Sequence, residues 1–170
     1  MSSALTIRVS RGTGSGPTRL AAFDAALQSA GVADLNLVRL SSVIPPGAQV
    51  VEVPSLEQLS GGHGDVLLCV YADAYASTPG EDAWAGVAWS THTDGSGAGL
   101  FVEHSGSSEP SVRHDLKATL AAMSRTRAAA YGMAGETITS AHCVDHPVCA
   151  VVVAAYQTVG WTGSGRIGAI

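Results

Sequence analysis

The sequence predicts an α+β fold, a layered αββα sandwich of mostly antiparallel strands with helices on the outer faces. Two segments carry apolar residues at helical spacing. Several other segments alternate apolar and polar residues or run continuously apolar, as strands do. Clusters of glycine, proline, serine and aspartate separate these segments and mark turns.

Size and composition indicate one domain. The chain has 170 residues, of which 46% are hydrophobic and 14% charged, so it is long enough for a proper core and is not a disordered chain. We expect a single domain over residues 1–160 and a loosely ordered C-terminal tail over residues 161–170.

Charge and hydropathy exclude several classes of partner. The net charge is −5, and one lysine and eight arginines are scattered along the chain, so no basic stripe exists for nucleic acid. No apolar run approaches the 18 or so residues of a spanning helix, which argues against a membrane partner. The N-terminus lacks the pattern of a signal peptide, and we therefore expect a cytoplasmic location.

The chain begins with an alternating strand at residues 5–9, which the glycine-rich stretch 12–17 is expected to end. A helix is predicted within residues 18–31, because Thr18 is a suitable N-cap and Gly31 a suitable terminator. Its buried face would hold the apolar residues at three-to-four spacing: Leu20, Phe23, Ala26, Leu27 and Ala30.

Residues 35–40 alternate again and predict a buried strand that ends at Ser41 and Ser42. Pro45 and Pro46 donate no backbone hydrogen bond, so they end the ladder and stiffen the exit. Two interpretations remain open from these residues alone. The serine pair is either a plain strand end or a rigid frame that concentrates strain on one peptide bond.

The remaining elements follow in order. Residues 48–53 predict a short edge strand, and further strands are expected at 65–76, 84–90 and 97–105. A second helix is predicted over residues 111–132, with Gly132 ending it and with Val112, Leu116, Leu120 and Met123 on its buried face. Two more strands are expected at 137–144 and 148–159. The three cysteines, Cys69, Cys143 and Cys149, have no metal or disulfide spacing and are interpreted as reduced core residues.

Three familiar kinds of site are disfavoured by spacing. His142, Cys143, Asp145 and His146 are all metal-competent, but the two histidines would lie roughly 13 Å apart on a strand, so we predict no metal. The glycine-rich stretch 11–18 lacks the spacing and the lysine of a phosphate-binding loop. A Ser-His-Asp hydrolase is unsupported because no G-x-S-x-G motif is present.

Residues 21–50, "AAFDAALQSAGVADLNLVRLSSVIPPGAQV", resemble the N-terminal part of the pyruvoyl-dependent arginine decarboxylases. The resemblance covers the helix, Asn36, the serine pair and the double proline in one continuous stretch. Residues 97–106, "GAGLFVEHSG", resemble the strand of that family that bears a catalytic glutamate. The order of elements agrees over residues 5–157.

The resemblance implies self-processing between Ser41 and Ser42. In such proteins the hydroxyl of the second serine attacks the carbonyl of the first, and elimination from the resulting ester leaves a residue that hydrolyses to a pyruvoyl group. Mapped here, Ser42 would be nucleophile and precursor of a covalent pyruvoyl cofactor, and Ser41 would become a new C-terminus. The ketone of that cofactor would serve as the electron sink for decarboxylation.

The same resemblance assigns roles to four further residues. Glu103 matches the proton donor that acts after carbon dioxide leaves, and Asp24 matches the residue that binds the substrate guanidinium. Asn36 would orient the serine pair or the substrate, and Leu27 would line the pocket. The departures "GVADLN" and "EHSG" from better-known members leave the substrate range open.

The expected activity is therefore the conversion of L-arginine to agmatine and CO2 by a homotrimer or a dimer of trimers, with the site between neighbouring protomers. Two alternatives stay open. One is a related pyruvoyl-dependent decarboxylase of another amino acid, and the other is an unprocessed homologue that binds a ligand without catalysis.

Overall fold

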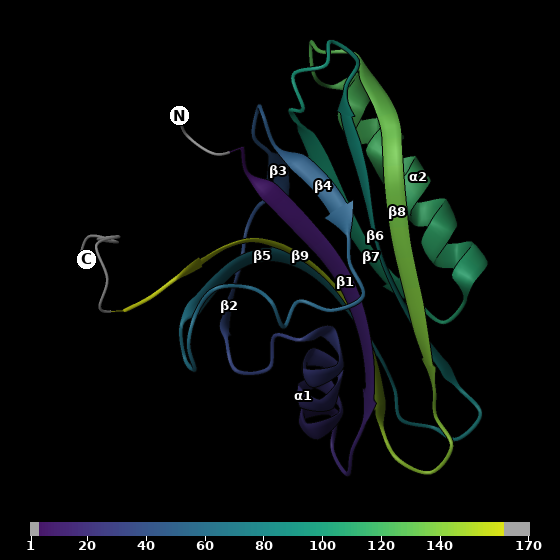
Figure 1. The fold of residues 1–170 in the computed structure, drawn as a ribbon. Helices are drawn as coiled ribbons and strands as arrows, with labels where there is room; N and C mark the ends of the chain where they lie inside the picture. The colour runs from purple at the N-terminus through teal and green to yellow at the C-terminus, as the bar shows by residue number, and fades with distance from the viewer. Residues whose placement is uncertain (1–3, 162–170) are drawn as a thin grey trace.

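Two sheets pack face to face, and one helix covers each outer face (Figure 1). The computed structural model describes residues 4–161. Among these residues the strands are β1 (Thr6–Ser15), β2 (Asn36–Arg39), β3 (Val43–Ile44), β4 (Gln49–Glu52), β5 (Val66–Ala76), β6 (Asp82–His92), β7 (Gly99–Gly106), β8 (Tyr131–His142) and β9 (Val148–Val159). The helices are α1 (Arg19–Ala30) and α2 (Glu109–Arg125). The predicted α+β sandwich is confirmed.

The five-stranded sheet has the order β2-β5-β9-β1-β4, and the four-stranded sheet has the order β3-β7-β6-β8. Two pairs, β1 with β4 and β2 with β5, are parallel. The other five pairs are antiparallel, as expected for a sandwich of mostly antiparallel strands. Because β2 and β3 belong to different sheets, the chain between them must cross from one layer to the other.

The core lies mainly between the sheets. Inward-facing side chains alternate along each strand and fill this space; they include Ile7, Val9, Val70, Val87, Phe101 and Val152. Two smaller apolar clusters lie under the helices. Ala22, Ala26 and Leu27 of α1 pack on the outer face of the five-stranded sheet, and Val112, Leu116 and Leu120 of α2 pack on the four-stranded sheet.

The first strand is longer than the sequence indicated. The stretch 12–17 was expected to be a turn, but β1 continues through Gly12 and Gly14 to Ser15. These glycines lie directly beneath α1, where a Cβ atom at Gly14 would lie 2.4 Å from the backbone nitrogen of Ala26. Glycine is therefore required here by the close approach of a helix, not by a turn.

Gly14→Ala is expected to destabilise the protein by about 1–3 kcal/mol, because the added methyl group must push α1 away from the sheet. Gly132→Ala is the matched control, since its Cβ would meet only Thr93 at 3.5 Å. Urea unfolding of the two variants measures the difference. Equal stability of both variants would contradict this account of the close approach.

The predicted caps of the first helix are confirmed. The Thr18 side chain accepts a hydrogen bond from the Ala21 backbone N–H, and Gly31 ends α1 in the left-handed conformation at φ 87°. Its predicted buried face is wrong at one position, because Leu20 is 77% exposed. Leu20 and Asp24 both lie on the solvent side of α1.

The second helix ends earlier than predicted, at Arg125 instead of near Gly132. The Ser124 and Thr126 hydroxyls donate to the backbone carbonyls of Leu120 and Met123, and the Arg127 side chain also donates to Met123. These bonds satisfy the last carbonyls of the helix, so the helix ends here. Residues 131–142 form β8, so the strand predicted at 137–144 begins six residues earlier.

The strand before the serine pair was predicted to be buried, and this is wrong. β2 is four residues long and lies at the edge of the five-stranded sheet, with three of its residues exposed. The prediction of a short edge strand at 48–53 is confirmed by β4, and the strands predicted at 65–76, 84–90, 97–105 and 148–159 correspond to β5, β6, β7 and β9.

All three cysteines are buried and free, as the sequence indicated. Burial raises the pKa of Cys69 to about 12 and that of Cys149 to about 12, so both thiols stay protonated at neutral pH. Within residues 4–161 no helix is both long and apolar enough to span a bilayer. Residues 162–170 of the predicted tail lie outside the described residues.

Candidate active site

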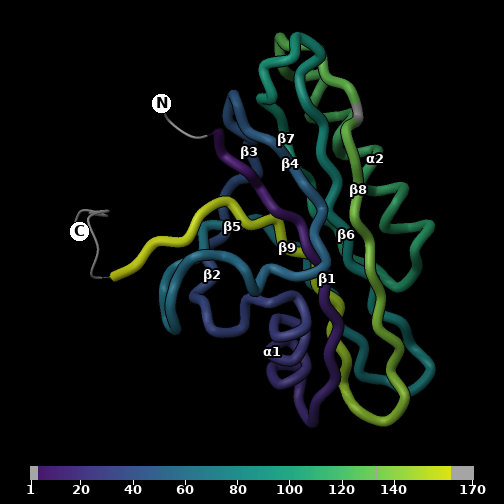
Figure 2. The backbone as a smooth tube through the Cα atoms, viewed as in Figure 1, coloured from purple at the N-terminus to yellow at the C-terminus, as the bar shows by residue number. Residues whose placement is uncertain are grey.

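Ser41 and Ser42 lie on the segment that crosses between the two sheets, from the end of β2 to the start of β3 (Figure 2). Ser41 is exposed, whereas Ser42 is 8% exposed. Among the described residues, Ser42 alone has a positive φ without being glycine, at 70°. A side chain in this region costs on the order of 1–2 kcal/mol, so backbone strain is concentrated at the Ser41–Ser42 peptide.

The Ser42 hydroxyl donates a 2.5 Å hydrogen bond to Oε1 of Glu103. This length is typical of a hydroxyl bound to an ionised carboxylate. Glu103 lies on β7 two residues after Phe101, so both side chains face the space between the sheets. A carboxylate in this position can accept the proton of the hydroxyl as the oxygen attacks a carbonyl carbon.

Two further hydrogen bonds hold the segment that follows Ser42. The backbone N–H of Phe101 donates to the Ser42 carbonyl at 2.8 Å, and the Tyr156 hydroxyl donates to the Val43 carbonyl at 3.0 Å. Tyr156 extends from β9, in the other sheet, and its ring packs against Phe101 with the centroids 6.0 Å apart. Burial, together with the negative charge of Glu103, raises the pKa of Tyr156, so its hydroxyl remains a donor.

A small cavity of about 110 Å³ contains Glu103 and is lined on its other side by Arg39, Tyr71 and Asp73. Arg39 pairs with Asp73 at 3.3 Å and lies 4.0 Å from the centre of the Tyr71 ring. The cavity therefore joins β2 and β5 of one sheet to β7 of the other.

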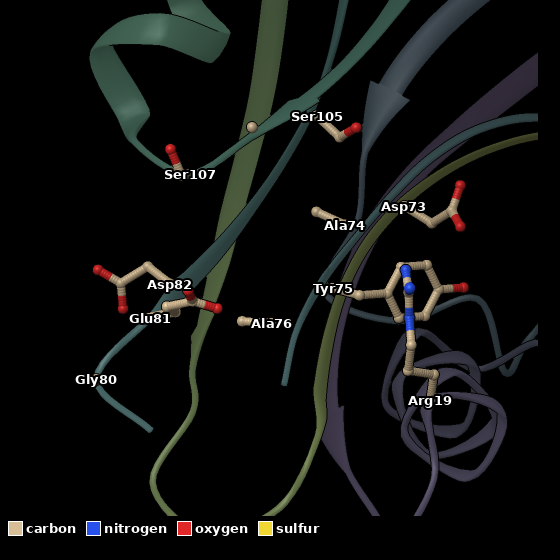
Figure 3. Close-up of a pocket in the computed structure, with 11 residues that line it drawn as sticks. Arg19, Asp73, Ala74, Tyr75, Ala76, Gly80, Glu81, Asp82, Ser105 and Ser107 are labelled. Carbon is tan, nitrogen blue, oxygen red and sulfur yellow. The ribbon is translucent and has the colours of Figure 1, made fainter. Parts of the chain in front are cut away.

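A larger cavity of about 680 Å³ continues along the same open edge of the sandwich and shares Asp73 and Ser105 with the small one (Figure 3). Glu81 and Asp82 line one side, and the Arg19 guanidinium lies over the Tyr75 ring on the other, 4.4 Å from its centre. Burial and the adjacent Asp73 raise the pKa of Tyr75. The two cavities, which share Asp73 and Ser105, are together called the groove, and Glu103 lines its smaller part.

The structure brings Ser41, Ser42 and Glu103 together but places the other predicted site residues elsewhere. Asn36 is at the far end of β2, where its side-chain amide donates to the Gly64 carbonyl at 2.6 Å. Leu27 is 7% exposed and packs under α1 in the apolar cluster of the five-stranded sheet.

Asp24 lies on the exposed side of α1 and accepts a hydrogen bond from the Gln28 side chain at 2.8 Å. In Figure 1, α1 lies near the lower end of the molecule and β3 lies in its upper half. Asp24 lines neither of the two cavities described above, of which the smaller contains Glu103.

The metal-competent segment 142–146 makes contacts of other kinds. His142 pairs with Asp82 at 2.7 Å, and the Cys143 thiol donates to the His146 carbonyl. In the part of the chain that the structure describes, no group of three or more His, Cys, Asp or Glu side chains is arranged to hold a metal ion.

Sequence reasoning missed Tyr156 and the Arg39–Asp73 pair. One signal for Tyr156 was available, because it continues the alternate positions Val152 and Ala154, whose side chains face the space between the sheets. An aromatic residue with a polar tip at the end of such a series is suited to reach a polar group near the edge of a core. No sequence signal places Arg39 beside Asp73, since 33 residues separate them.

Together, the fold and this site define a class of protein: an αββα sandwich in which a strained serine, on the crossing between two sheets, faces a carboxylate on the neighbouring strand. The model of the pyruvoyl-dependent arginine decarboxylase family matches residues 6–159. The chain belongs to that family.

Relatives named pyruvoyl-dependent arginine decarboxylase match a shorter part of the chain. The protein of Halobacterium salinarum is 43% identical over 104 residues, which cover 61% of this chain and 62% of the relative. The protein of Methanothermobacter thermautotrophicus is 36% identical over 101 residues, covering 59% and 62%. The protein of Methanocaldococcus jannaschii is 35% identical over 101 residues, covering 59% and 58%. The matched region thus spans less than two thirds of these relatives.

Proposed function

We propose that this protein cleaves itself between Ser41 and Ser42, converts residue 42 into a pyruvoyl group, and decarboxylates L-arginine to agmatine and CO2. The observation that supports this most directly is the Ser42 hydroxyl, held 2.5 Å from Glu103 on a strained backbone. Membership of the pyruvoyl-dependent arginine decarboxylase family supports the cofactor and the substrate.

The self-cleavage uses the chain's own atoms and one water. Glu103 takes the Ser42 hydroxyl proton as Oγ bonds to the Ser41 carbonyl carbon, and the amide C–N bond breaks as this proton passes to the freed nitrogen of residue 42. Loss of the α-proton of residue 42 then expels the Ser41 carboxylate. Water replaces the nitrogen, which leaves as ammonia. Relief of the positive φ at Ser42 lowers the barrier to the first step.

The residues around position 42 fit the cofactor that this reaction makes. The pyruvoyl ketone supplies a carbonyl that condenses with the substrate amine and takes up the electrons left by carbon dioxide. Ser42 is nearly buried, so the ketone formed from it is shielded from bulk water, and Glu103 is positioned to return a proton to the product.

The groove favours a cationic substrate. Asp73, Glu81 and Asp82 line the groove, whose smaller part contains Glu103, and Arg19 and Arg39 are engaged with Tyr75, Tyr71 and Asp73. Because Asp73 pairs with Arg39 and Asp82 pairs with His142, Glu81 is the carboxylate of this wall that would attract a guanidinium-bearing substrate. Asp24 would bind that guanidinium from a second chain. Such an arrangement favours a trimer or a dimer of trimers, with the site between protomers. Asn36 and Leu27 of one of the two chains would complete the site.

Intact mass of the purified protein tests the cleavage. Two species are expected, residues 1–41 and residues 42–170. The longer one should carry a pyruvoyl group in place of Ser42, and this pyruvoyl group should react with a carbonyl reagent. A single 17.2 kDa species that persists through prolonged incubation would contradict the proposal. CO2 release from arginine, ornithine, lysine, histidine and aspartate then separates an arginine decarboxylase from a relative with another substrate.

Asp24→Asn is expected to raise KM for arginine by about 10- to 100-fold, because a neutral amide loses the charge-assisted pair with the guanidinium. Self-cleavage should proceed at the wild-type rate, since the Asp24 side chain bonds to Gln28 on the exposed side of α1, whereas the Ser42 hydroxyl bonds to Glu103. Asp34→Asn is a matched control on an exposed loop, where Asp34 pairs only with the exposed His63. An unchanged KM in the Asp24 variant would remove this residue from the substrate site.

A further inference from the structure

Cleavage between Ser41 and Ser42 would turn residue 42 into a free chain end, and free ends fray unless they are held. The strand that follows is only two residues long: Val43 and Ile44 pair with Leu100 and Gly99 at the edge of the four-stranded sheet. Val43 is 55% exposed, so its side chain adds little anchoring. The end therefore needs further contacts if it is to stay beside Glu103.

Three hydrogen bonds hold residues 42 and 43 in the uncleaved chain. The bond from the Ser42 hydroxyl to Glu103 disappears when that oxygen leaves with Ser41. The bond from the Phe101 backbone to the Ser42 carbonyl, 2.8 Å, and the bond from the Tyr156 hydroxyl to the Val43 carbonyl, 3.0 Å, both use atoms that cleavage leaves in place. Of these two, only the second depends on a side chain.

We propose that Tyr156 is a positioning residue, whose hydroxyl holds the Val43 carbonyl and so keeps residue 42 against Glu103 before and after the chain is cut. This inference rests on the proposed function. It assigns to β9, a central strand of the opposite sheet, the task of holding a short edge segment at the point where the two layers meet.

The surroundings of Tyr156 suit it to this task. Its ring packs against Phe101, the residue whose backbone N–H donates to the Ser42 carbonyl. The two residues that hold the chain end therefore contact each other. The ring also belongs to the apolar layer between the sheets, which fixes its orientation. Because burial and the charge of Glu103 keep the hydroxyl protonated, it donates throughout the neutral and mildly alkaline range.

Tyr156→Phe removes the hydroxyl and keeps the ring. The time course of cleavage, followed by denaturing gel after expression of the full chain, is expected to slow about fivefold, which corresponds to the loss of one hydrogen bond of ~1 kcal/mol. In the cleaved protein, kcat should fall by a similar factor with KM for arginine unchanged within about twofold. Amide exchange of Val43 and Ile44 should become faster.

Tyr131→Phe is the control, because Tyr131 lies on β8 at the opposite edge of the four-stranded sheet and packs its ring against His92. Thermal unfolding of both variants in a Ser42→Ala background checks that the two lose similar stability. Cleavage of Tyr156→Phe at the wild-type rate, or slowed no more than in Tyr131→Phe, would overturn the inference alone. A wild-type chain that never splits would overturn it together with the proposed function.

Discussion

Ser42→Ala is expected to yield an uncut chain of 170 residues with no decarboxylase activity above background. The change removes the only atom of residue 42 that can attack the Ser41 carbonyl, and with it the precursor of the cofactor. The fold should survive, because alanine fits wherever serine does and the lost contact is one hydrogen bond to Glu103. Intact mass and CO2 release from arginine measure the two losses.

Ser41→Ala is the matched control for this experiment. Ser41 is exposed, and only its backbone carbonyl takes part in the proposed cleavage. The variant should therefore split between residues 41 and 42 and retain activity within a fewfold of the wild type. Cleavage that persists in Ser42→Ala would contradict the role of Ser42 as nucleophile. Cleavage that disappears in Ser41→Ala would contradict the purely backbone role of Ser41.

Local sequence signals predicted the elements whose ends are marked by caps and turn residues. Thr18 and Gly31 bound α1 as expected, and the alternating or continuous apolar runs became β5, β6, β7 and β9. Signals failed where tertiary packing reassigned a residue. Gly12 and Gly14 were predicted to form a turn. In the structure, glycine is required at both positions because α1 packs directly against them, and a linear sequence does not show that contact.

The site was predictable in part. Adjacent serines followed by Pro45 and Pro46 suggested a strained bond, and the structure places the strain at Ser42. The sequence did not indicate why. The expected cause was a buried strand, whereas the chain is in fact leaving an exposed edge strand of one sheet to enter the edge of the other. Which edge strands face each other depends on the packing of the sheets, which no local pattern encodes.

The contact between Ser42 and Glu103 joins residues 61 positions apart and changes the expected role of the glutamate. From the sequence, Glu103 was assigned only to the protonation that follows loss of carbon dioxide. Its position beside the hydroxyl gives it an earlier task, because a carboxylate that accepts this hydrogen bond is also the group best placed to take the proton during cleavage.

Glu103→Gln is therefore expected to impair two reactions. An amide still accepts a hydrogen bond from Ser42 but takes up no proton, so cleavage should slow by about 100-fold, within the range typical of a lost general base. The fraction that does mature should turn over arginine about 100- to 1000-fold more slowly per pyruvoyl group, because the same position then lacks a proton donor.

Measuring the two steps separately distinguishes the tasks. Cleavage is followed by gel, and the matured fraction is quantified with a carbonyl reagent before CO2 release is assayed. Glu57→Gln, on an exposed loop, should leave both rates unchanged. Cleavage of Glu103→Gln at the wild-type rate with turnover abolished would confine Glu103 to decarboxylation. The short hydrogen bond from Ser42 to Glu103 would then position the hydroxyl, and Glu103 would not be the group that takes its proton.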